Sequence, residues 1–105
     1  MGLEDYVEVG STGVASDNDD ITVDDTVGGV VLLAENPARK SALITNTGTD
    51  TMRVTTDGSD PTATHGKQIR PGSSLVLGSP YCPTDEVKAI RQNMSDTTAN
   101  ASEVD

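Results

Sequence analysis

Turn signals recur at short intervals along this chain, and they constrain its fold more than any other feature. They occur at GSTG, DNDD, VGG, ENPA, NTGTD, DGSDP, RPGSS and GSPYCP. The segments between them are short and rich in Val, Ile and Thr, and no window of about a dozen residues keeps its apolar residues at helical spacing. Short strands separated by frequent turns are typical of all-β sandwiches and barrels. The sequence therefore predicts one domain, a small antiparallel β-sandwich or barrel.

Three regions can be distinguished along the chain. Residues 27–92 hold the densest strand pattern and are expected to form the sandwich core. Residues 1–26 are expected to form an extended N-terminal arm with one or two short strands, at 3–9 and 21–23. Residues 93–105 are polar, and they are expected to form either a tail or a final edge strand.

Within the core, the expected strands are residues 27–34, 41–47, 51–56, 67–70, 74–78 and 86–92. The second and third of these are expected to form a hairpin, because Gly48 tolerates positive φ and Asp50 favours a turn. Pro71 and Gly72 are expected to form the centre of a type II turn.

The apolar content predicts association with other chains. Only 33% of residues are hydrophobic, Trp and Phe are absent, and Tyr6 and Tyr81 are the only aromatic residues besides histidine. Large rings usually contribute much of the buried apolar area, and a small domain buries a modest share of its surface. We therefore expect a homo-oligomer, with a trimer favoured.

Acidic residues dominate the charge, with 17 acidic against 7 basic side chains and a net charge of −10. Such a surface repels phosphates, so neither nucleic acid nor an anionic membrane is an expected partner. No apolar run approaches the ~18 residues of a membrane helix, and the N-terminus lacks the pattern of a signal peptide. The many Asp and few Lys residues have two interpretations: simple solubility, or adaptation to a salt-rich medium that screens self-repulsion.

Residues that could carry chemistry are few. Cys82 lies between two prolines with no basic neighbour, and His65 is the only histidine. No phosphate-binding glycine motif occurs either. The sequence thus predicts a protein that is not an enzyme and has no cofactor or metal. For the acidic run 17–25 an irregular cation site remains the alternative to a solvated loop, and the sequons at Asn93 and Asn100 remain possible glycosylation sites.

An adjacent basic pair, Arg39 and Lys40, directly precedes the expected strand at 41–47. One interpretation is that these side chains neutralise carboxylates within the fold or in a symmetric neighbour. The other is that they contact an acidic partner protein. Together with Tyr6 and Tyr81, they are the candidate partner-contact residues.

Residues 36–91 resemble a small β-sandwich module found in structural proteins of tailed viruses. The shared pattern is an N-P-x-R turn before a strand, a strand ending N-x-G, a P-T-x-x-x-G loop and a P-G turn. The matching positions are Asn36, Pro37, Arg39, Asn46, Gly48, Pro61, Thr62, Gly66, Pro71 and Gly72. The chain departs from the pattern at Met52 and Val54, where aromatic residues are often seen in that family.

The resemblance implies that the protein is a virion component. Combined with the acidic composition, it implies a tailed virus whose host is a halophilic archaeon. The first expectation is a capsid decoration protein that is made in the host cytoplasm and binds the outer surface of the major capsid protein. Its arm 1–26 would contact that shell by strand addition. The alternatives are a head-fibre base, turret, neck or tail component and, in another class, a glycan- or cell-surface-binding sandwich.

Overall fold

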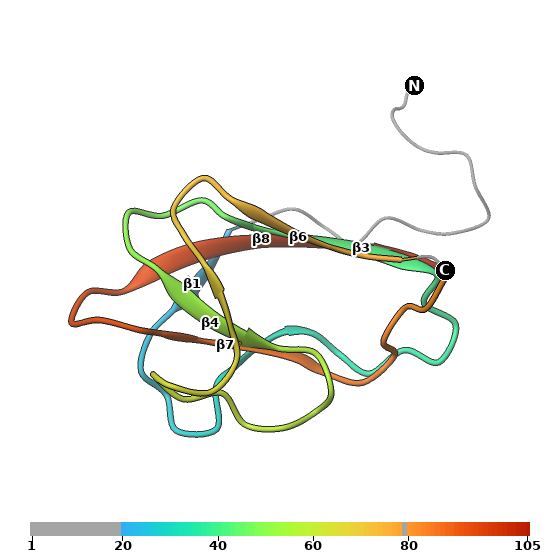
Figure 1. Ribbon diagram of the computed structural model, residues 1–105, viewed down its shortest axis with the longest axis horizontal. Coiled ribbons are helices and arrows are strands. Elements are labelled where there is room, and N and C mark those ends of the chain that lie inside the picture. Colours follow the sequence, from blue (N-terminus) through green and yellow to red (C-terminus); the bar gives the residue numbers. More distant parts are fainter. Residues whose placement is uncertain (1–19, 79) are drawn as a thin grey trace.

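Two antiparallel sheets packed face to face make up the protein in the computed structural model, which describes residues 20–78 and 80–105 (Figure 1). The strands are β1 (Ile21–Val23), β2 (Val30–Leu33), β3 (Ser41–Asn46), β4 (Met52–Thr55), β5 (Lys67–Ile69), β6 (Ser74–Leu77), β7 (Val87–Arg91) and β8 (Thr97–Val104). Sheet A has the order β1-β8-β3-β6, and sheet B has the order β2-β7-β4-β5. The predicted all-β antiparallel sandwich is confirmed.

The core between the sheets is aliphatic throughout the described residues. Side chains alternate along the strands, so that Ile44 of β3 and Met52 of β4 point inward and are fully buried. The buried apolar set comprises Val23, Leu32, Leu33, Ala42, Ile44, Met52, Val54, Ile69, Leu77, Val87, Ala89, Ala99 and Ala101. Small alanines on β7 and β8 allow the layers to interdigitate without aromatic rings.

The predicted hairpin between residues 41–47 and 51–56 is wrong. Strand β3 pairs with β6 and β8 in sheet A, whereas β4 pairs with β5 and β7 in sheet B. The connection therefore crosses from one sheet to the other. Gly48 is not among the glycines with positive φ; a Cβ at this position would instead lie 2.5 Å from the backbone nitrogen of Thr98. Close approach of the β8 backbone is the reason for this glycine.

The side chain of Asn46 holds this crossing together. Its Nδ2 donates to the carbonyl oxygens of Asp50 (2.7 Å) and Ile69 (2.8 Å). Its Oδ1 accepts from Gly48 N (3.0 Å) and from the Thr97 hydroxyl (2.8 Å). The amide thus uses its two donors and two acceptor positions while fully buried. A single buried side chain thereby connects the ends of β3, β5 and β8.

The C-terminal residues differ from expectation. Residues 97–104 are neither a tail nor an edge strand, because β8 lies between β1 and β3 inside sheet A. The sequence of β8 is polar because its inward positions are Thr97, Ala99 and Ala101, while its outward positions include Thr, Asn and Ser. Toward the start of the described residues, β1 pairs with β8, so residues 21–23, which were expected to belong to the arm, are part of the sandwich. The predicted strand at 3–9 and Tyr6 lie outside the described residues.

Two predicted turns are present. Arg39 N donates to Asn36 O (3.0 Å), and the Asn36 side chain accepts from Ala38 N (3.0 Å), which closes the turn before β3. Ser73 N donates to Arg70 O (2.9 Å), and Gly72 has a φ of 80°, as a type II turn requires. One turn leads directly into β3, and the other connects β5 to β6 with few intervening residues.

Candidate protein-binding surface

Arg39 is an internal residue of the fold. Its guanidinium donates to the carbonyl oxygens of Ala34 (2.7 Å), Pro83 (2.9 Å) and Asp85 (3.0 Å), and its Nε donates to the Glu103 carboxylate (2.7 Å). The side chain has no exposed surface. A direct contact between Arg39 and a partner is therefore excluded, and neutralisation of a carboxylate within the fold is the interpretation that holds.

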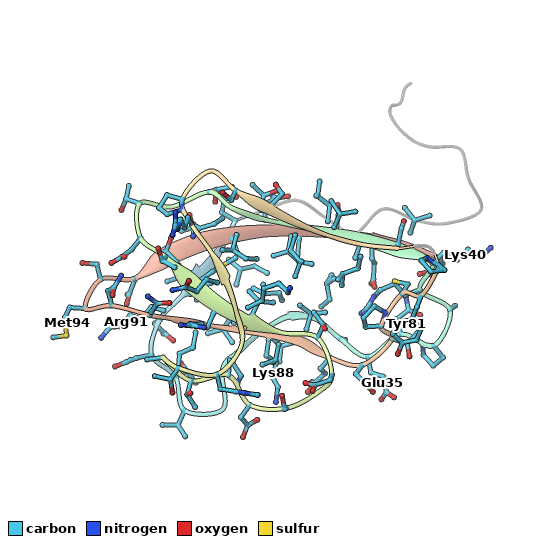
Figure 2. All side chains as sticks on the ribbon, viewed as in Figure 1. Glu35, Lys40, Tyr81, Lys88, Arg91 and Met94 are labelled. Atoms are coloured by element: carbon cyan, nitrogen blue, oxygen red, sulfur yellow. The ribbon has the colours of Figure 1, made fainter. Side chains whose placement is uncertain are left out.

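Lys40 and Tyr81 lie at the same end of the sandwich, where both are labelled in Figure 2. Lys40 is exposed, and the ring of Tyr81 is 73% exposed in the loop after β6. Glu35 lies at this end as well (Figure 2). These side chains are accessible to a partner.

The structure brings His65 close to Ser59, a neighbour that the sequence analysis did not identify. The Ser59 hydroxyl lies 3.1 Å from His65 Nε2 and also donates to Asp57 Oδ1. These bonds lower the pKa of Asp57, chiefly through the Ser59 hydroxyl. In a catalytic triad the carboxylate orients the imidazole, whereas here it accepts a hydrogen bond from the serine hydroxyl. Asp57 and Ser59 form a local turn in which the aspartate carboxylate accepts hydrogen bonds from the backbone N–H and the hydroxyl of the serine.

The described acidic groups near the start of the sandwich are already paired. Asp24 Oδ1 accepts from Thr26 N (2.9 Å), and Asp25 pairs with Arg91 (3.2 Å). Within residues 20–78 and 80–105, no three histidine, cysteine or carboxylate side chains converge as metal ligands would. Residues 17–19 of the acidic run lie outside the described part. Cys82 is half-buried and packs against the core.

The outer face of sheet A is the most distinctive surface of the described residues. Strand alternation directs ten side chains to this face: Thr22, Ser41, Leu43, Thr45, Ser74, Val76, Thr98, Asn100, Ser102 and Val104. None of them is ionisable, although the chain carries 17 acidic residues. We call this surface the neutral face. Asp20 lies at its rim, with Oδ1 3.5 Å from Asn100 Nδ2.

An apolar pair occupies part of the neutral face. Leu43 of β3 lies directly opposite Val76 of β6, and these side chains are 42% and 73% exposed. Together with Ser41, Ser102 and Val104 they line a shallow hollow of about 370 Å³. The inward-facing Ala42 and Glu103 also contribute to its lining, and the Glu103 carboxylate is bonded to Arg39. Hydroxyl groups on neighbouring strands bond to each other beside it, at 2.8 Å between Thr45 and Ser74. The result is an apolar patch bordered by uncharged hydrogen-bonding groups, the composition of a protein-binding surface.

The outer face of sheet B has a different character. Lys88 lies on it, 2.7 Å from the Asp60 carboxylate, and this hydrogen bond raises the pKa of the lysine. Arg53 donates to Gln92 (2.8 Å) on the same side. The loops around residues 24–29 and 57–66 lie on the side of sheet B that faces away from sheet A (Figure 1). Charge and loop coverage thus distinguish the two faces.

The sequences of two strands carry a signal for the neutral face. In SALITN and SLVL, the positions that alternate with the buried residues are Ser, Leu, Thr and Val, without a charged side chain. In an acidic chain, that pattern on two strands indicates an outward face kept free of charge. Only the pairing of β3 with β6 shows that the two strands contribute to one surface.

By its fold and its neutral face, the protein is an all-β sandwich with a candidate protein-binding surface. Comparison with protein-family models and with curated proteins gives no match for the sequence. No helix in the described residues is long and apolar enough to span a bilayer.

Proposed function

We propose that this protein is a non-enzymatic virion component of a tailed virus of a halophilic archaeon, and that it decorates the outer surface of the capsid shell. The observation that carries the proposal is the neutral face, with Leu43 and Val76 at its apolar patch. The turn pattern shared with tailed-virus structural proteins supplies the class of partner.

Electrostatics explain why such a face suits this role. A net charge of −10 keeps separate copies apart in solution and opposes contact with an acidic shell. Contact through a surface without carboxylates avoids placing like charges against each other, and it buries Leu43 and Val76. Molar salt screens the charges that remain around the contact.

The proposal is tested by mixing the purified protein with empty expanded capsids in molar salt and measuring co-sedimentation. We expect the parent protein to bind and Leu43→Lys to lose binding, because a charge would replace the apolar patch. Gln68→Lys is the matched control, since Gln68 is exposed on β5 of the other sheet. Unfolding curves of both variants check that the fold is intact.

The number of copies in native particles provides the second test. Hundreds of copies are expected for shell decoration, whereas a dozen or fewer would indicate a neck, turret or tail position. A parent protein that does not bind capsids would refute decoration. Specific hits on a glycan array would instead favour the cell-surface-binding alternative.

A further inference from the structure

Strand β6 is the one edge of the described sheets that lacks protection against pairing with another strand. Sheet edges expose backbone hydrogen-bonding groups, and proteins usually protect them with charges, prolines, bulges or very short strands. Strand β1 has three residues and is flanked by Asp20 and Asp24, and β2 contains a bulge between Val31 and Leu33. Strand β5 also has three residues and begins with Lys67.

None of these devices is present in β6. Its four residues are Ser-Leu-Val-Leu, and its register against β3 is regular over all four pairs. The flanking residues, Ser73 and Gly78, are also uncharged. Residues 72–77 therefore form an uncharged edge segment that includes Val76 of the neutral face, and Gly78, which follows it, pairs with Tyr81.

The backbone groups available at this edge can be identified from the ladder. Asn46 N donates to Ser73 O (3.0 Å) and Asn46 O accepts from Gly72 N (2.8 Å), so Ser73 is a bonded position where the ladder with β3 begins. Such positions alternate along an antiparallel ladder, which assigns Leu75 and Leu77 to bonds with β3. Ser74 and Val76 consequently direct their N–H and C=O groups away from the sheet.

An apolar opening lies beneath the same edge. A cleft of about 260 Å³ between the two sheets is lined by Leu75 and Leu77 of β6 and by Val54 and Lys67 of sheet B. Thr55, Thr56, Asp57, His65 and Gly66 complete its lining. Leu75 is only partly buried. A strand added next to β6 would place its own inward side chains over this cleft.

We infer that β6 pairs with β6 of a second copy of this chain, antiparallel and about a two-fold axis. An antiparallel pair of identical strands is self-complementary, so the same edge serves both copies. The uncharged side chains of β6 suit a like-charged partner, because two chains of net charge −10 can meet along this strand without a carboxylate of β6 opposing the second copy.

The pairing would have three consequences. Ser74 and Val76 of each copy would exchange backbone hydrogen bonds with the other. The inward leucines of each copy would cover the cleft of its partner. The neutral faces of the two copies would join into one continuous surface, with both Leu43–Val76 pairs near the axis.

The test uses the purified full-length protein alone, by sedimentation velocity over a range of concentrations in molar NaCl. We expect a dimer for the parent and a monomer for Val76→Pro, because proline removes the outward N–H yet is tolerated on a strand edge. Val76→Lys should weaken association at least about tenfold through charge repulsion. Thr22→Lys, on the opposite edge of the same face, should remain dimeric.

Several outcomes would overturn the inference. A parent protein that is monomeric at all concentrations contradicts it, as does a monomer that dimerises only after deletion of residues 1–19. A dimer or trimer that persists in both Val76 variants also contradicts it. If Val76→Pro fails to fold, Val76→Lys and Ser74→Lys give the same comparison. Capsid binding plays no part in these measurements, so they stand apart from the test of the proposed function.

Discussion

At the scale of single residues, the two members of the basic pair have separate roles despite being adjacent. The strand that follows directs Arg39 into the fold and leaves Lys40 in solvent. Arg39 satisfies three carbonyl oxygens and one carboxylate from three segments, and its planar fork suits this number of acceptors. A lysine has a single charged nitrogen and could not bridge the same groups.

This difference predicts the effect of replacing each basic residue. Arg39→Gln should destabilise the protein by about 3–5 kcal/mol, because it leaves the part-buried carboxylate of Glu103 without this cation. Lys40→Gln should change the free energy of unfolding by less than about 0.5 kcal/mol, as expected of an exposed side chain. Urea unfolding measures both. Equal, small effects of the two substitutions would contradict the internal role of Arg39.

At the scale of elements, the sequence predicted most strands but not how they pair. Of the eight strands in the described part of the chain, seven fall within segments expected from the sequence, and their bounds agree within a few residues. The exception is β8, whose inward Thr97, Ala99 and Ala101 lack the hydrophobicity that marks a strand. The hairpin prediction failed because the NTG segment carries turn chemistry either way. Whether it reverses a strand within one sheet or crosses between sheets depends on the buried bonds of Asn46.

The two turn glycines, Gly48 and Gly72, give a prediction at this scale. Gly48→Ala should cost several kcal/mol, at least about 3, because its methyl group would overlap the backbone of β8 at Thr98. Gly72→Ala should cost only about 1 kcal/mol, since φ is 80° but no atom lies within 4 Å of the added carbon. Thermal unfolding of the two variants compares them. A larger loss for Gly72→Ala would show that backbone strain outweighs steric overlap here.

At the scale of the whole molecule, charge is distributed unevenly over the surface. Carboxylates are concentrated in the loops, where neighbouring groups stabilise their ionised form. The Thr26 hydroxyl lowers the pKa of Asp24, the Asn93 side chain lowers that of Asp50, and the Ser59 hydroxyl lowers that of Asp57. Acid therefore removes favourable loop contacts at the same time as it reduces repulsion between copies.

The sign of the resulting pH dependence follows from these lowered pKa values. The unfolded chain protonates Asp24, Asp50 and Asp57 first, near their ordinary pKa of 3.8, so the stability they contribute is present above that pH and is lost below it. In molar NaCl, which screens the general repulsion, the midpoint of thermal unfolding should fall as the pH is lowered from about 5 to about 2.

A combined variant provides the control for this prediction. Replacing all three aspartates with asparagine preserves hydrogen-bond acceptors but removes the titrating groups, so its midpoint should depend less on pH than that of the parent. Identical pH profiles for the two proteins would assign the acid response to other carboxylates.

The sequence by itself determined the all-β class, the positions of most strands and the acidic surface, because turn residues and side-chain alternation are local properties of the chain. The tertiary structure decided which strands became neighbours, and this placed β8 inside sheet A, buried Arg39, and brought Leu43 and Val76 together. These outcomes depend on contacts between residues far apart in the chain, whose partners no local pattern specifies. The neutral face and the β6 edge are products of that pairing.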